Sequence, residues 1–512
     1  MSVDQRHPLF VQRVLQWEKM HDSHKGEDQI KAKGRTYLPA TRGMEIDGLG
    51  AGKPGYNAFI RYRDRAVYHD FVRAAVEVCL GLMHRENATI EVPAALEPML
   101  ENMTVDGESA QTLLRKINEY QLIYGRLGLL LEAPDGVPVN EALPFAAVYD
   151  PRTIINWDDG RRDQGQQALE LVVLDESEWE RESRFIWDYE AKYRVLIRAN
   201  QAETETQEDQ SGVAEGTYGV ATFRDGQTDF DASLLTFPEI GGNNLDFIPF
   251  VFINTNDLVT DPDDPPFLGL ANLCLAIYRG EADLRQALHN QGQDTLVITG
   301  GKLDKDARIG AGAKIELKEN GDAKFIGVNS DGLSEMREVL SQDKAAAGEM
   351  TQKLVDRDSG SAQSGEALRV RMGSKTATLS QIAQTGAEGL KAFLRMAAEW
   401  VGADPDEVVV EPNLDFADEE LTGQNMLQMI QAHDQGFPIS KQSLHRIAKK
   451  RDLTVLDFDE EMEIISQEKE DAMSEGLANG LGGPGAPGEG IEPPASPEDE
   501  EVEDDEDTTE EG

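Results

Sequence analysis

Two amphipathic segments of similar length constrain the fold of this chain more than any other feature of its sequence. In residues 265–290, apolar side chains recur every three to four positions: Phe267, Leu270, Cys274, Ile277, Leu284 and Leu288. In residues 331–355, the same spacing places these side chains on one face: Leu333, Met336, Leu340, Ala347, Met350 and Leu354. Such spacing predicts two long α-helices, the first of them a rod of about 40 Å at ~1.5 Å per residue.

The segment between the two helices, residues 291–330, predicts a small β insert. It holds strand-like stretches at 295–300 and 313–328, and Asn320-Gly321 favours the positive φ of a hairpin turn. Basic residues gather in this insert: Lys302, Lys305, Arg308, Lys314, Lys318 and Lys324. Nearby carboxylates nearly cancel them: Asp304, Asp306, Glu316, Glu319 and Asp322. The insert is therefore either a surface that docks a partner or DNA, or ordinary interleaved surface charge.

The first 85 residues predict an irregular segment followed by a helix. Residues 1–57 are expected to be irregular, because the glycines and prolines over 34–57 favour turns. Residues 58–85 predict a helix with one apolar face: Phe59, Val67, Phe71, Ala74, Val78 and Leu82. The other face of that helix is either solvated or binds a partner, and it carries four arginines: Arg61, Arg63, Arg65 and Arg73.

A helix over 109–126 and a run of short strands are predicted next. The strand-like stretches are rich in β-branched and aromatic residues and are bounded by turn-forming or polar residues: 145–157, 169–174, 184–198, 217–224 and 247–254. This succession predicts an antiparallel β-meander. Together with the long helices it places the chain in the α+β class.

The composition changes twice beyond the second long helix. Residues 356–366 are small and polar, and residues 367–417 begin with a helical stretch that ends at Trp400. Residues 418–473 are predicted to be helical. The tail, residues 474–512, is rich in Asp, Glu, Gly and Pro, cannot collapse onto a core and is predicted to be disordered.

The overall charge excludes one class of nucleic-acid binding. With 49 Lys plus Arg against 96 Asp plus Glu, the formal charge is 49 − 96 = −47. A chain-wide basic surface would be needed to hold phosphates through counterion release, and this chain has the opposite sign. Only a local basic patch remains compatible with the composition.

Searches for catalytic and metal-binding motifs fail. The glycine-rich stretch 48–55 is not a P-loop, because Asp47 stands where the first glycine belongs and Pro54 follows the Gly-Lys pair. The sequence lacks CxxC, HExxH and GxSxG motifs, and His21 and His24 are a polar pair with no third ligand nearby in sequence. We therefore expect no catalytic residue, no metal site and no cofactor, and a protein that is not an enzyme.

An acidic loop before the first long helix leaves two readings open. It carries Asp257, Asp261, Asp263 and Asp264. These carboxylates are able to hold a hard cation, but they lack the spacing and the central glycine of an EF-hand. Helix capping by Asp264 ahead of Pro265, together with solvation, explains them as well.

The cysteines and the hydropathy pattern indicate the environment of the chain. Cys79 and Cys274 lie far apart inside apolar helical patterns, so we expect buried free thiols rather than a disulfide or a metal pair. Apolar runs fall well short of the roughly twenty residues that cross a bilayer, and the first thirty residues lack the apolar block of a signal peptide. We expect a soluble, intracellular chain.

The order of these segments resembles portal proteins of tailed bacteriophages. The resemblance rests on PPFLGLANLCLAIYRGEADLRQALHNQGQDTLVITG at 265–300, followed by the β insert, the second long helix and SGSAQSGEAL at 359–368. Three further stretches fit the same order: NEYQLIYGRLGLLLEAP at 118–134, YDPRTIINW at 149–157 and GFPISKQSLHRIAKKRDLTVLDFDEEMEIISQE at 436–468. The acidic tail and the first 57 residues lie outside the likeness.

The resemblance implies a portal architecture with named parts. Residues 58–264 and 367–417 would form the wing, 265–290 and 331–355 the two stem helices, 291–330 the clip, and 418–473 the crown. Residues 356–366 would form a tunnel loop facing the DNA channel: Asp356, Arg357, Asp358, Ser359, Gly360, Ser361, Gln363 and Ser364. The basic residues of the clip would be the partner-docking set.

By the same resemblance, the chain would form a ring, usually of twelve copies, at one capsid vertex of a virion. Such rings are assembled in the host cytoplasm and serve DNA packaging and ejection. The implied partners are double-stranded DNA, the large terminase, the head-tail connector or adaptor, the major capsid protein and scaffold, with no membrane. The alternatives are a nucleic-acid-processing enzyme of a phage or mobile element, and an acidic DNA-mimic chaperone suggested by the tail.

Overall fold

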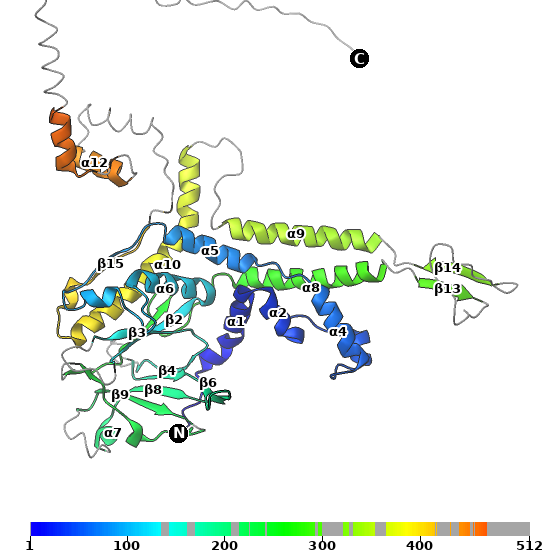
Figure 1. Ribbon diagram of the computed structural model, residues 1–512, viewed down its shortest axis with the longest axis horizontal. Coiled ribbons are helices and arrows are strands. Elements are labelled where there is room, and N and C mark those ends of the chain that lie inside the picture. The colour runs from blue at the N-terminus through cyan, green and yellow to red at the C-terminus, as the bar shows by residue number, and fades with distance from the viewer. Residues whose placement is uncertain are drawn as a thin grey trace, which may run out of the picture. The chain divides into compact units, whose positions relative to one another are not determined.

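The computed structural model (Figure 1) divides the chain into two compact units, residues 1–417 and 418–512. The residues that it describes are 2–134, 143–160, 169–205, 214–224, 226–240, 243–291, 295–299, 321–326, 331–353, 365–414, 416, 431, 440–450, 454 and 456–467. The statements below concern these residues.

The prediction of an irregular segment over 1–57 is wrong. Helices occupy much of it: α1 (Pro8–Lys25), α2 (Glu27–Ala32), the 3-10 helix η1 (Gly34–Thr36), α3 (Arg42–Ile46) and the start of α4 (Pro54–Arg65). Helix α1 buries Phe10, Trp17 and Met20, which lie on one helical face, so packing against the core fixes it. Gly55, in the first turn of α4, allows α4 to approach α3 closely, because an added Cβ would lie 2.0 Å from the carbonyl oxygen of Met44.

The single helix predicted over 58–85 is two helices. Helix α4 ends at Arg65 with extended backbone at Ala66, and α5 (Phe71–Met83) follows. The predicted face of α5 is also wrong, because Ala74 and Val78 are exposed. Its buried residues are Val72, Ala75, Val76, Cys79, Leu80 and Met83. Nearly every position of α5 is apolar, so spacing alone did not determine which face is buried.

Two antiparallel sheets form the β-rich part. One has the order β12-β2-β3, with strands Phe250–Asn254, Arg126–Glu132 and Phe145–Tyr149. The other has the order β4-β5-β8-β9, with strands Ile154–Asp158, Leu171–Asp175, Tyr193–Arg198 and Tyr218–Phe223. The second sheet confirms the predicted meander. The stretch 145–157 divides between the sheets, because the backbone turns at Asp150, whose carbonyl accepts from the Thr153 amide at 3.1 Å.

The stretch predicted as one strand over 184–198 also divides. Its first part is β7 (Trp187–Glu190), which pairs with β6 (Glu178–Arg181) in a separate two-stranded hairpin between β5 and β8. Its second part is β8. The remaining short elements of this region are α7 (Gln201–Glu205), η3 (Ala232–Leu234), β10 (Glu239–Ile240) and β11 (Asn243–Asn244).

Helix α10 (Gly365–Trp400) packs on α6 (Ala110–Tyr124), as Figure 1 shows, and it also contacts β12. Close approach requires glycine, since a Cβ on Gly386 would lie 2.4 Å from Asn118 Nδ2 and one on Gly389 would lie 2.4 Å from Ile253 Cδ1. The chain then returns to the N-terminal half: β15 (Val409–Glu411) pairs with β1 (Thr89–Glu91). The 3-10 helices η2 (Glu97–Leu100) and η4 (Pro405–Glu407) complete the unit.

The second unit is described over a short range. Helix α12 (Lys441–Lys450) is followed by a helix over 458–467. Most of the segment predicted as a helical crown, 418–473, and the predicted disordered tail, 474–512, lie outside the described residues.

Candidate functional site

The two helices predicted from apolar spacing form an arm of the first unit. Helix α8 (Leu268–Gln291) and helix α9 (Asp331–Lys353) run antiparallel, and Figure 1 shows them carrying a small two-stranded sheet at their far end. That sheet pairs β13 (Thr295–Thr299) with β14 (Asp322–Ile326). Residues 300–320, which include Asn320 of the predicted hairpin turn, lie outside the described residues.

Helix α8 is the buried half of the arm. It contacts α1, α4 and α5 as well as α9. At ~100° of turn per residue, its buried side chains cover about half of the helix circumference: Leu270, Ala271, Cys274, Leu275, Ile277, Tyr278, Glu281, Ala282 and Leu284. It begins at Leu268, rather than at Pro265 as predicted.

Helix α9 packs along a single line. Its buried apolar side chains are Leu333, Leu340 and Ala347, at seven-residue spacing. The line fits against α8 at Gly280, where an added Cβ would lie 2.7 Å from Leu340 Cδ2. The opposite face is exposed, and among the residues whose side chains the structure describes it carries three carboxylates and no cation: Glu335, Glu338, Val339, Gln342, Ala345, Ala346 and Glu349. We call these seven residues the outer face of α9.

A buried carboxylate joins the two helices. Glu281 on α8 accepts hydrogen bonds from Arg285 Nε at 2.7 Å and from Lys344 Nζ on α9, and His69 Nε2 lies 3.8 Å away. Burial alone would raise the pKa of Glu281, but the hydrogen bonds from Lys344 and Arg285 hold this pKa below its ordinary value. Glu281 is therefore ionised at neutral pH and fixes the register of α9 on α8. Sequence reasoning missed it, although a glutamate within an apolar stripe is a usable signal.

The predicted tunnel-loop residues lie outside the described part of the chain: Asp356, Arg357, Asp358, Ser359, Gly360, Ser361, Gln363 and Ser364. The same holds for most of the predicted clip set: Lys302, Lys305, Arg308, Lys314 and Lys318. The remaining member, Lys324, lies on β14, is exposed and is 3.6 Å from Asp322. The roles of both sets, as a tunnel loop and as a partner-docking surface, therefore stay predictions.

The acidic loop uses its carboxylates to fold itself. Asp263 Oδ2 accepts from the amides of Thr255 and Asn256 at 3.1 and 3.0 Å. Asn254 Nδ2 donates to Asp257 Oδ1 at 2.8 Å. Asp264, predicted to cap the first long helix, pairs with Arg13 of α1 instead. Within the described residues, we find no group of three or more His, Cys, Asp or Glu side chains placed to hold a metal ion.

The titratable groups flagged by the sequence are structural where the coordinates describe them. His21 Nδ1 lies 2.9 Å from Tyr124 Oη, and burial followed by the charge of Arg152 lowers the pKa of His21 to about 4. Cys79 and Cys274 are buried free thiols, as predicted, and burial raises the pKa of each to about 12. None of these groups is exposed as a base or nucleophile.

Arg126, which is buried in the core, was not identified from the sequence. The Arg126 guanidinium lies 4.5 Å from the ring centroid of Trp157 and 4.1 Å from that of Phe252. Burial lowers the pKa of Arg126 to about 9, while Asp261 and Asp263 oppose the shift. Cation–π contacts with these two rings stabilise this charge inside the core. No spacing in the sequence identifies such a contact, because Arg126 and its two aromatic partners come from three different strands.

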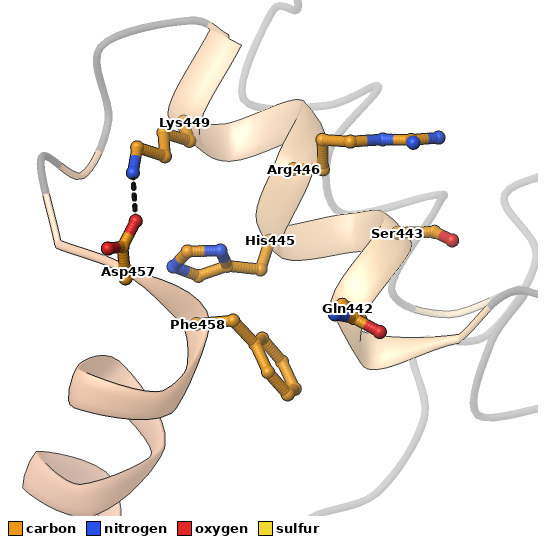
Figure 2. A pocket seen from close by; sticks show the side chains of 7 residues that line it. All are labelled: Gln442, Ser443, His445, Arg446, Lys449, Asp457 and Phe458. Carbon is orange, nitrogen blue, oxygen red and sulfur yellow. Dashed lines mark hydrogen bonds and ion pairs between the residues drawn. The ribbon is translucent and has the colours of Figure 1, made fainter.

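The second unit has a cleft of about 400 Å³ between α12 and the following helix. Figure 2 shows His445, Arg446 and Lys449 on α12, with Lys449 paired to Asp457 and the His445 ring edge-on to Phe458 at 5.5 Å. Gln442 and Ser443 complete the lining. This is a cationic helix packed on an acidic one, and the Ser443 hydroxyl in the lining is hydrogen-bonded to Ser440 Oγ at 2.9 Å.

Membrane insertion finds no support in the described helices: none of them combines the length and the apolarity needed to span a bilayer.

Comparisons with known proteins give distant likenesses. A family described as a domain of unknown function, DUF4055, matches residues 266–401, which run from α8 to α10 and make up less than half of the chain. No curated protein matches the chain.

Solved structures of gene transfer agent particles are similar to this chain. A chain from the neck of a native particle, computed with C12 symmetry, has a TM-score of 0.36 at 12% identity and covers 74% of this chain and 89% of its own length. A chain from an empty-particle neck, computed with C6 symmetry, has a TM-score of 0.36 at 14% identity, covering 73% and 88%. A chain from the native virion gives 0.37 at 14%, covering 79% and 98%.

Proposed function

We propose that this chain is a portal protein. Copies of it would form a ring, of twelve subunits by the family resemblance, at one vertex of a capsid. DNA would pass through the ring during packaging and ejection. The ring would dock the large terminase and later the head-tail connector, with the major capsid protein and scaffold around it. It would assemble in the host cytoplasm and remain in the virion, without a catalytic residue or a cofactor of its own.

The observation that carries this proposal is the arm. An antiparallel helix pair with a small sheet at its tip stands out from the body, and one of its helices, α9, leaves its outer face exposed. Residues 356–366, the proposed tunnel loop, follow α9 directly in sequence. We therefore place the outer face of α9 on the DNA channel.

The charge of that face suits the role. Glu335, Glu338 and Glu349 would repeat around the ring as bands of carboxylates. Lysines and arginines at the same positions would contact phosphates and add up to a strong attraction that depends on salt. Carboxylates instead repel the duplex and keep it from adhering while it moves. The proposed channel thus guides DNA by excluding it from the wall.

Electron microscopy of the purified full-length chain tests the ring. We expect axial views with a central hole and a matching mass by native mass spectrometry. A protein that stays monomeric at every concentration and salt, or that hydrolyses nucleotide by itself, would overturn the proposal.

A charge-reversal pair tests the channel face. Glu335→Lys with Glu338→Lys should leave rings intact and make DNA passage slower at low salt than at high salt. The matched control, Glu86→Lys with Glu97→Lys, reverses two exposed carboxylates of the body and should change neither ring assembly nor DNA passage.

Replacing residues 358–365 by a shorter linker tests the tunnel loop. This variant should assemble rings normally but package or retain DNA poorly. Normal packaging by that variant would remove the tunnel-loop assignment.

A further inference from the structure

The β6–β7 hairpin exposes an unusual amount of aromatic surface. Trp179, Phe185, Trp187 and Tyr189 are each more than half exposed, and so is Ile186. At roughly 200 Å² per aromatic side chain, they leave on the order of 500 Å² of apolar surface in water. Exposed patches of this size mark interaction sites on soluble proteins.

The strand register sorts the hairpin into two faces. Trp179 pairs with Tyr189, and Arg181 pairs with Trp187, so these four side chains share one face. Trp179 and Tyr189 meet edge to face at 5.5 Å, and the Arg181 guanidinium lies 5.6 Å from the Trp187 ring. The aromatic face is therefore ordered by its own contacts before any partner arrives.

The other face of the hairpin sets like charges against each other. Glu178 pairs with Glu190, and Glu180 pairs with Asp188. Directly opposed like charges destabilise a strand pair, and Arg224, at 3.7 and 3.9 Å from Glu180 and Glu190, offsets them only in part. A partner that brings cations would relieve this repulsion. The hairpin therefore fits a partner surface that is both apolar and basic.

The α3–α4 helical hairpin of the same chain has these properties. Arg42, Lys53 and Arg61 are exposed, and none of these three side chains is paired with a carboxylate of the described part of the chain. Ile46 and Tyr56 add exposed apolar surface between them. Such a surface is scarce on a chain with a formal charge of −47. In Figure 1, α4 projects from the body beside α8 and lies apart from β6.

We propose that the β6–β7 hairpin of one copy docks on the α3–α4 hairpin of the next copy. This inference rests on the proposed function, because a closed ring needs two different surfaces on each subunit that match each other. Aromatic anchors fill the apolar part of the contact, and the opposed carboxylates receive the unpaired cations. Complementarity of both kinds within one sequence favours a second copy over another protein as the partner.

The test uses two full-length variants, each lacking one surface. The first is Trp179→Ala with Trp187→Ala, and the second is Arg42→Glu with Arg61→Glu. Each alone should lose rings, with association at least on the order of tenfold weaker, as for the loss of interface anchors. Leu15→Ala, which truncates an exposed leucine of α1, is the control and should form rings normally. Circular dichroism should be unchanged in all three, since every substituted side chain is exposed.

Mixing the two variants gives the decisive result. Each supplies the surface that the other lacks, so the mixture should stop at dimers containing one copy of each, as measured by native mass spectrometry. A chain carrying Glu180→Arg and Asp188→Arg together with Arg42→Glu and Arg61→Glu should regain rings. Rings that persist in either variant, or a mixture without dimers, would overturn the docking proposal while wild-type rings leave the portal proposal standing. If the wild-type protein forms no rings, the portal proposal itself is contradicted.

Discussion

Helices α8 and α9 have nearly the same length and lie side by side, yet they are different kinds of element. Helix α8 has 24 residues and α9 has 23. The first buries about half of its circumference and touches α1, α4 and α5, whereas the second buries a single line of three apolar residues and touches α8 and α5. One is part of the core of the unit, and the other is a surface layer held by α8 and α5.

The difference shows that similar apolar spacing does not imply similar burial. A helix held along one line retains a wide face for solvent, a channel or another subunit, at little cost to the fold. The buried half of α8 cannot lose a methyl group without loss of packing. Function is therefore expected to act through α9 and stability to depend on α8, and the following predictions test this division.

The largest effect is expected for Ile277→Ala in α8. Ile277 is fully buried, and removal of such a side chain costs about 3 kcal/mol of the free energy of unfolding through lost transfer energy and the cavity left behind. Urea unfolding followed by tryptophan fluorescence measures it. A loss below about 1 kcal/mol would show that α8 is not core.

The next effect concerns the link between the helices. Glu281→Gln keeps the size of the side chain but removes the charge that accepts from Lys344 and Arg285. Hydrogen bonds to a buried charge are worth about 1.5–3 kcal/mol, and the low end applies because both cations are partly exposed. We expect a loss of about 2 kcal/mol at pH 7.

The difference in unfolding free energy between wild type and Glu281→Gln should depend on pH. The pKa of Glu281 is lower in the folded chain than its ordinary value of 4.5, so the stabilisation is fully present above that ordinary value and is lost as the pH falls through the lowered pKa. The difference in unfolding free energy between wild type and Glu281→Gln should therefore narrow below pH 4.5. A difference that grows on acidification would contradict the assignment of Glu281 as an ionised acceptor.

A smaller effect is expected in hydrogen exchange. Because α9 is held along one line, it can open while α8 stays packed, and segments with few buried contacts exchange at lower opening free energies. In dissociated subunits, the amides of α9 should exchange on the order of tenfold faster or more than those of α8. Equal protection of the two helices would contradict the conclusion that α9 opens more easily than α8.

The smallest effect on stability is expected for Val339→Ala on the outer face of α9. Val339 is 55% exposed, and surface substitutions usually change the free energy of unfolding by about 0.5 kcal/mol or less. Thermal unfolding beside Ile277→Ala gives the comparison. A large loss would mean that another part of the chain covers this face.

Several elements could be predicted from the sequence because their signal is local. The two arm helices, the antiparallel meander and the buried thiols follow from apolar period, β-branched content and the surroundings of each cysteine. The course of 145–157 could not, since the turn at Asp150 sends its two halves to different sheets. Helix α1 was missed because its buried residues lie far apart along the helix, among polar ones.

The candidate site shows the same limit. Apolar spacing predicted both α8 and α9 but did not distinguish how much of each is buried. It left two readings of the acidic loop, a cation site or helix capping with solvation. In the structure Asp263 accepts hydrogen bonds from loop amides, and Asp264 pairs with Arg13 instead of capping the helix. The exposed aromatic hairpin appeared only as part of a longer strand. Its significance comes from exposure, which depends on what the rest of the chain leaves uncovered.

The sequence by itself determined the α+β class, the helix pair with a β insert and the strongly acidic charge, because each is carried by residues that are neighbours along the chain. Tertiary structure alone decided that α8 buries a wide face while α9 buries a single line and keeps an exposed carboxylate face, and that Glu281 joins them. It also decided that Trp179 and Trp187 face solvent. Burial is a property of distant segments brought together, and no local period records which side of a helix or hairpin another segment will cover.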